Sequence, residues 1–175
     1  MLKKANAALA LLGILLAAIH AAICAIDGFF AAPHPAGASP LTAALAVAFL
    51  AHAMISMGIL FFNKSDNSKL YAAHNKQTAE QRIAAIALIA LAGVHYAIFS
   101  GNGYLKRLFM SGFPVIGVSL LLLATAFTSH VMASVHRALI TLGIHHKAIL
   151  IPLKVLLLAV YGLSVASAVY VYFIG

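Results

Sequence analysis

The sequence has very few charged residues. Asp, Glu, Lys and Arg make up 8% of its 175 residues, whereas soluble domains carry about 25%. This shortage, together with a hydrophobic content of 64%, excludes an ordinary water-soluble globule, a disordered tail and a nucleic-acid-binding module. The chain also has a single cysteine, Cys24. An internal disulfide, a CxxC metal motif and a CxxCH motif are therefore excluded as well.

Acidic residues are scarcest of all. The chain has 3 Asp and Glu against 11 Lys and Arg, which gives a net charge of +8 with histidine neutral. In a chain this apolar, with a mean hydropathy of +1.05, excess basic charge is typical of the cytoplasmic loops of a membrane protein. Histidine is abundant instead: the 9 His outnumber the acidic residues.

Five apolar stretches approach or exceed the length of about 20 residues that a membrane-spanning helix needs. They cover approximately residues 7–26, 41–62, 83–99, 114–139 and 151–174. The connections between them are short and rich in Pro, Gly, Asn or charged residues, so they leave no room for a soluble domain. We therefore predict one all-α integral membrane domain over residues 1–175, a bundle of five transmembrane helices with lipid around it.

The distribution of Lys and Arg predicts the orientation. With five spans the termini lie on opposite sides, and 9 of the 11 basic residues fall on the side of the N-terminus, leaving Lys106 and Arg107 on the other. Cytoplasmic loops carry the excess of Lys and Arg. We expect a multi-pass protein of the cell inner (cytoplasmic) membrane, with the N-terminus in the cytoplasm and the C-terminus outside.

Four histidines lie inside four different spans: His20, His52, His95 and His130. An ionisable residue within a membrane is a functional hypothesis by default. With a rise of about 1.5 Å per residue, His20 and His95 lie about 10 and 8 Å below the outer rim, and His52 and His130 about 17 and 24 Å below it. The four thus form two levels, each with two imidazoles from non-adjacent helices.

Two imidazoles at one level suit a b-type haem, a flat group between helices with one axial histidine on each side. Small residues near the candidate ligands leave room for it: Ala51, Ala53, Gly93 and Gly13. A lone membrane histidine is more often a helix–helix hydrogen-bond partner, but four at two levels are harder to explain in that way. A metal-ion carrier would usually add carboxylates, and no carboxylate is expected at mid-membrane.

Three segments carry a resemblance to a known family. Phe49–Met57 is similar to a HAFLAM-type ligand segment, Gly93–Tyr96 to a GSVHLY-type segment and His130–Arg137 to an HGSVGLYR-type run. Over about residues 10 to 145, the chain resembles the dihaem cytochrome b membrane subunit of succinate dehydrogenase and fumarate reductase complexes, in its single-chain five-helix form. Where some members carry a Glu two residues before the fourth ligand, this chain has Thr128.

The resemblance implies a set of cofactors and partners. It implies two haem b groups enclosed by four helices, one held by His20 and His95 near the outer face and one by His52 and His130. It implies a membrane quinone, menaquinone or ubiquinone, as substrate, and two cytoplasmic partners, an FAD-containing flavoprotein subunit and an iron–sulfur subunit, in a complex that can form higher oligomers. The chain itself would be a non-catalytic electron-transfer subunit, with dicarboxylate chemistry in a partner.

Several polar residues are candidates for supporting roles. The haem propionates would seek cations on the cytoplasmic side, where the candidates are Arg137, Arg82 and His136; membrane anchoring explains Arg137 equally well. Candidates for binding quinone are Asp27, His34 and Asn102 near the outer face and His74 and Ser134 near the inner face. The fifth span lacks histidine, so we expect it to pack outside the other four. Two alternatives remain open: a dihaem anchor of another flavin-dependent dehydrogenase, and a haem-free histidine-based metal-ion carrier.

Overall fold

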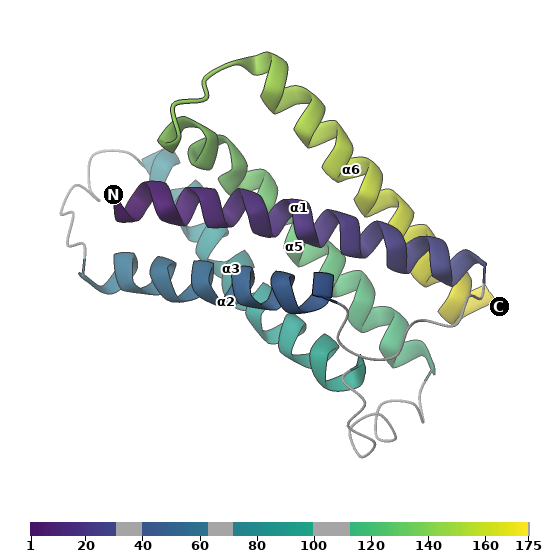
Figure 1. Ribbon diagram of the computed structural model, residues 1–175. Helices are drawn as coiled ribbons and strands as arrows, with labels where there is room; N and C mark the ends of the chain where they lie inside the picture. Colours follow the sequence, from purple (N-terminus) through teal and green to yellow (C-terminus); the bar gives the residue numbers. More distant parts are fainter. Residues whose placement is uncertain (31–39, 63–71, 100–112, 175) are drawn as a thin grey trace.

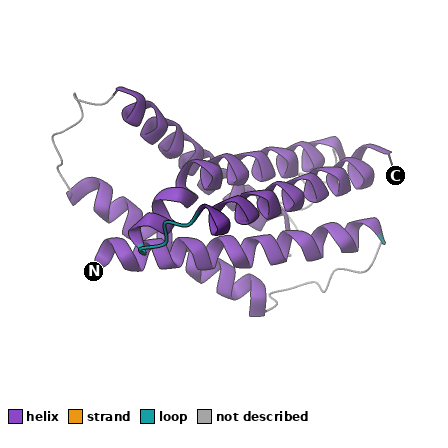
Figure 2. Ribbon diagram, turned by 90° about the horizontal axis from the view of Figure 1, so that it is seen from above, coloured by secondary structure: helices purple, strands orange, loops and turns teal. Residues whose placement is uncertain are grey.

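A computed structural model describes residues 1–30, 40–62, 72–99 and 113–174, and these residues form helices and short turns with no strand (Figures 1 and 2). The helices are α1 (Leu2–Phe29), α2 (Pro40–Phe62), α3 (Ala72–Phe99), α5 (Phe113–Thr141) and α6 (Lys147–Val169), and α6 continues into the π-helical turn η2 (Tyr170–Ile174). The predicted all-α architecture is thus confirmed over the described residues.

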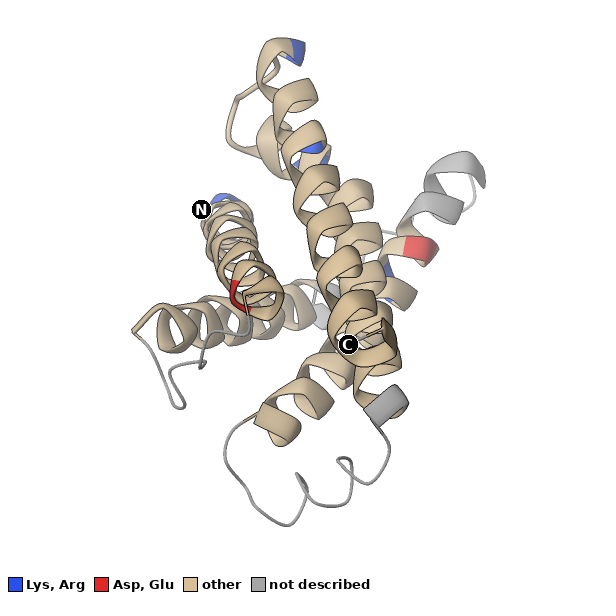
Figure 3. Cartoon of the chain, turned by 90° about the vertical axis from the view of Figure 1, so that its right-hand side faces the viewer, with Lys and Arg blue, Asp and Glu red and all other residues tan. Residues whose placement is uncertain are grey.

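All five helices are long and apolar enough to cross a membrane, as expected of a multi-pass membrane protein. Charged residues are sparse along them (Figure 3), and the two termini lie at opposite ends of the bundle (Figure 1). Large apolar side chains such as Val47, Met54 and Ile86 are exposed on the helix surfaces. In a bilayer such side chains face lipid rather than water.

Helix α3 differs most from the prediction, because it begins at Ala72, eleven residues before the expected residue 83. A hydropathy pattern detects only the apolar part of a helix, whereas residues 72–82 include Ala, Gln, Lys, Glu and Arg, which are good helix formers in water. The helix therefore continues beyond the apolar stretch. This extension makes Gln81 and Arg82 helical and places Gln81 against α5.

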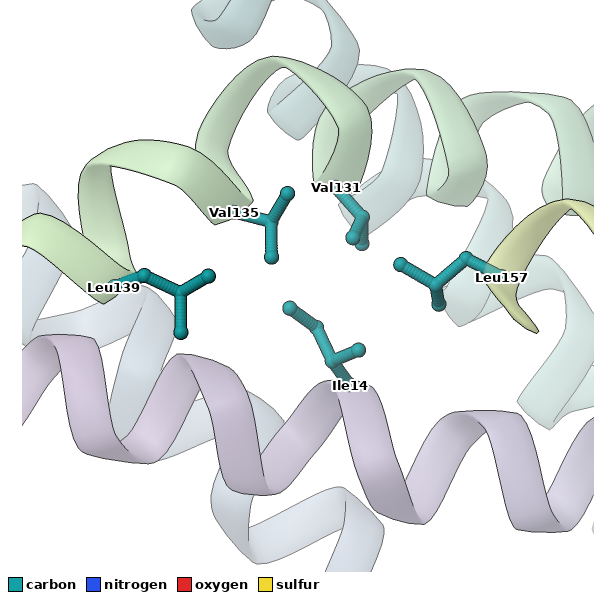
Figure 4. Packing of buried hydrophobic residues seen from close by; sticks show 5 residues of the cluster. All are labelled: Ile14, Val131, Val135, Leu139 and Leu157. Carbon is teal, nitrogen blue, oxygen red and sulfur yellow. The ribbon is translucent and has the colours of Figure 1, made fainter. Parts of the chain in front are cut away.

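A buried hydrophobic cluster lies where α1, α5 and α6 meet. Ile14, Val131, Val135, Leu139 and Leu157 form a buried cluster there (Figure 4), and the Val135 side chain is fully enclosed. Because lipid tails are as apolar as leucine, such a cluster stabilises the bundle through close van der Waals packing. Among the described residues α6 contacts α1 and α5 but neither α2 nor α3, which confirms that the fifth span lies outside the four histidine-bearing helices.

Those four helices form two hairpin-like pairs. Helix α1 packs along α2, α3 packs along α5, and the two pairs meet where α1 contacts α5. Over the described ranges, no Cα atom of α1 comes within 8 Å of one in α3, and the same holds for α2 and α5. The helices that were predicted to share a histidine pair therefore do not pack directly on each other.

Candidate functional site

The outer pair of histidines comes together as predicted from the sequence. His20 of α1 and His95 of α3 face each other with ring centres 6.3 Å apart and ring planes at 86°. The two helices do not pack on each other, so the rings meet across the space between them. Both side chains are partly buried.

This separation allows a direct test of whether a metal ion fits between the rings. Two imidazoles on opposite sides of one ion, each nitrogen about 2 Å from it, have ring centres about 6 Å apart. The distance of 6.3 Å between the ring centres of His20 and His95 is compatible with this separation, and it is also an ordinary spacing for an edge-to-face ring contact. A bare structural ion would need further ligands, yet the described residues contain no group of three or more His, Cys, Asp or Glu able to hold a metal. The donor set fits the two axial positions of a haem iron.

The surroundings of the outer pair are weakly polar. The Cys24 thiol lies 3.6 Å from Nε2 and 3.9 Å from Nδ1 of His20. The Nδ1 atom of His95 is buried and has no hydrogen-bond partner among the described residues, while the Phe99 ring packs 4.8 Å away. A buried nitrogen without a partner costs about 1–3 kcal/mol, so the environment of the outer pair is incompletely satisfied.

The inner pair is held differently. Nδ1 of His52 lies 3.3 Å from the backbone oxygen of Asn6 in α1, and Nδ1 of His130 lies 3.2 Å from the backbone oxygen of Gln81 in α3. A carbonyl oxygen can only accept, so in each contact Nδ1 carries the proton and Nε2 keeps its lone pair. Metal-binding histidines almost always show this arrangement.

Polar side chains reinforce both inner contacts. The Asn6 amide donates to Ser56 Oγ at 3.0 Å, and Ser56 Oγ lies 3.3 Å from Asn6 Oδ1. On the other side, Arg137 donates to Gln81 Oε1 at 3.2 Å and to Thr78 Oγ1 at 3.3 Å. The sequence analysis missed Asn6, Ser56, Gln81 and Thr78. Equal spacing was the available signal, because Asn6 precedes His20 by as many residues as Gln81 precedes His95.

The other predicted supporting residues are more scattered. Arg137 is partly buried against α3, whereas Arg82 and His136 are exposed. Ser134 donates to the backbone oxygen of His130 in its own helix, at 2.7 Å, and Asp27 lies near the end of α1. The quinone candidates His34 and Asn102, and the side chain of His74, lie outside the described residues.

Comparison of the chain with protein-family models, with curated proteins and with solved structures finds no match. Similarity therefore supplies neither a family nor a function. The functional argument depends on the positions of the histidines, their hydrogen bonds and the membrane-spanning helices around them.

Proposed function

We propose that this protein is the dihaem cytochrome b membrane-anchor subunit of a succinate dehydrogenase or fumarate reductase complex. In this proposal, it transfers electrons between a membrane quinone and two cytoplasmic partners, an FAD-containing flavoprotein subunit and an iron–sulfur subunit. His20 and His95 hold the outer haem, and His52 and His130 hold the inner one. The chain lies in the cell inner membrane with its N-terminus in the cytoplasm and its C-terminus outside.

The observation that carries the proposal is the facing pair of His20 and His95. The centres of their rings are 6.3 Å apart, which is compatible with one shared ion, and the two helices do not pack directly on each other. Two neutral imidazoles from apolar helices have few hydrogen-bonding groups around them. Together they would supply both axial ligands of one haem iron. The inner pair supports the same interpretation, because its Nδ1 contacts leave both Nε2 atoms available to a metal.

The residues of this chain would set the conditions for electron transfer. Bound haem supplies reversible one-electron chemistry. The histidines orient the group, and the apolar helices around them exclude water, which influences its potential. Arg137 provides positive charge beside the inner level, where anionic propionates would be stabilised. Thr128 has no acidic proton, so proton transfer through a carboxylate at that position is not part of the proposal.

A reduced-minus-oxidised absorption spectrum of the purified full-length protein, combined with haem and iron analysis, tests the proposal. We expect a b-type band and two haems per chain. Protein that is folded but shows no such band, after production with ample haem, would refute the haem account. Bound zinc or another ion in its place would favour the metal-ion carrier, although no group of three or more His, Cys, Asp or Glu is found among the described residues.

The identity of the partner needs a separate experiment. We expect the membrane-extracted complex to contain a flavoprotein and an iron–sulfur protein and to reduce both b haems when succinate is added. Reduction by a different substrate, with both haems present, would keep the cytochrome but assign it to another flavin-dependent dehydrogenase. The basic residues on the cytoplasmic side suit such a docking surface, although they also follow from the orientation rule.

A further inference from the structure

The second and fourth spans share more residues than their composition explains. When Leu45–Ser56 of α2 is aligned with Leu123–Ser134 of α5, seven of the twelve positions are identical. Matches of Ala and Leu are expected between any two spans of this chain. Rarer residues match as well, however: in both segments a Phe stands three positions before the histidine, a Met two after it and a Ser four after it.

The first and third spans show the same relation. Leu16–Ile23 of α1 and Leu91–Ile98 of α3 are identical at five of eight positions, including the histidine. The offset is 75 residues here and 78 between α2 and α5. Two helices in sequence order therefore correspond to the next two, with three extra residues in the second half.

The hydrogen bonds of His52 and His130 show the same correspondence between the two halves of the chain. The offset of 75 residues that relates His20 to His95 also relates Asn6 to Gln81, and these are the residues whose backbone oxygens accept from His52 and His130. The hydrogen bonds were not used to align the segments. Sequence and contacts therefore point independently to one repeated unit.

We infer that α1–α2 and α3–α5 are two copies of one helical hairpin, and that Asn6 and Gln81 are equivalent positioning residues for His52 and His130. The equivalent histidines His20 and His95 lie close together, with ring centres 6.3 Å apart. Each copy then contributes one ligand to each cofactor. The assignment of the imidazoles to haem rests on the proposed function.

Positioning works through the backbone oxygen. The oxygen accepts a hydrogen bond from Nδ1–H, which fixes the tautomer and leaves Nε2 unprotonated. In the first hairpin, the side-chain contact between Asn6 and Ser56 ties that oxygen to the turn that follows His52. In the second hairpin, Gln81 is tied instead to Arg137. The two copies therefore share the backbone contact but differ in the side-chain contact, which is neutral in the first hairpin and cationic in the second.

The repeat provides a matched pair of serines for the experiment. Ser56 clamps Asn6, whereas its counterpart Ser134 donates within its own helix. We expect Ser56→Ala to weaken retention of the inner haem about 10-fold, the lower end of the effect of such outer-shell partners. It should also shift the midpoint potential of that haem to more positive values, because the imidazole becomes a weaker donor. Ser56→Thr should restore both properties, and Ser134→Ala should change neither haem.

A haem-free measurement separates the inference from the proposed function. In the full-length protein without haem, ¹⁵N spectra of the histidine rings should show His52 and His130 protonated at Nδ1, with a mixture of tautomers at His52 in Ser56→Ala. Absence of haem from the wild-type protein would refute the proposed function but leave this result intact. A different outcome would overturn the positioning role of Asn6. In that outcome the wild type carries two haems, Ser56→Ala and Ser134→Ala have equal effects, and the tautomer of His52 does not change.

Discussion

The inner and the outer histidine pairs are oriented by different contacts. At the inner level, each imidazole is oriented by a backbone oxygen of the neighbouring helix in its own hairpin. At the outer level, the rings face each other directly, His20 lies beside the Cys24 thiol, and Nδ1 of His95 has no partner within the described part of the chain. The inner pair is thus oriented before any ligand arrives, while the outer pair depends more on packing.

This difference has a thermodynamic consequence. A site whose groups already hold their bound orientation loses less conformational freedom on binding, so more of its interaction energy appears as affinity. We therefore expect the inner haem to be held more tightly than the outer haem. The predictions below test this contrast, beginning with the largest expected effect.

Removal of one ligand should remove one haem. We expect His95→Ala to leave only the inner haem and His130→Ala to leave only the outer one, because each pair draws on separate helices. Haem content per chain, with circular dichroism as the control for folding, measures the outcome. A well-folded His95→Ala protein without either haem would contradict the pairing of the four histidines.

The order in which the two haems are released should reflect how firmly their histidine ligands are oriented. During stepwise extraction with a haem-binding acceptor protein, the outer haem of the wild type should leave about 10-fold faster than the inner one, because Nδ1 of His95 has no hydrogen-bond partner among the described residues and loss of one outer-shell partner typically weakens binding about 10-fold or more. His95→Ala and His130→Ala provide the reference spectrum of each haem. Faster release of the inner haem would reverse the proposed ranking.

A packing change at the outer end should affect the outer level first. A Cβ atom added at Gly117 in α5 would lie 2.8 Å from Cβ of Tyr172 and 2.6 Å from the Phe173 ring. We expect Gly117→Ala to lower the free energy of unfolding by about 1–3 kcal/mol, as overpacking does, and to speed outer-haem release. Gly162→Ala in α6 is the control, since a Cβ there meets nothing within 4 Å. Equal losses of thermal stability in both variants would argue against the close contact.

The smallest effect is expected at Cys24. Sulfur is a weak hydrogen-bond acceptor, and a hydroxyl is a stronger one, so Cys24→Ser should strengthen the contact to His20. The midpoint potential of the outer haem should then shift slightly to more negative values, with no change at the inner haem. A redox titration that resolves the two haems makes the comparison, and a shift confined to the inner haem would contradict the assignment of levels.

Much of the fold follows from composition and periodicity. The five apolar stretches correspond to the five helices, and the depth of His20 and His95 predicted that they share a level, because helical rise converts residue number directly into height. The start of α3 at Ala72 was not predicted, since polar helix formers extend a helix without a hydropathy signal. The contacts of His52 and His130 were also missed, because any residue can supply a backbone oxygen.

The internal repeat is intermediate between the features that the sequence predicts and the contacts that it does not. Its residues are visible in the sequence, but Ala and Leu matches obscure it, and the unequal offsets make it hard to find. It becomes clear once Asn6 and Gln81 are seen in equivalent hydrogen bonds.

The amino-acid sequence alone determined that this chain forms five apolar helices and that four of them carry a histidine at one of two heights, because hydropathy and helical rise are local properties. Only the tertiary structure decided which helices pair, which rings face each other and which oxygen orients each imidazole. These contacts depend on the rotation of each helix about its axis and on its packing. Lipid is equally apolar on every side of a helix, so lipid does not fix that rotation.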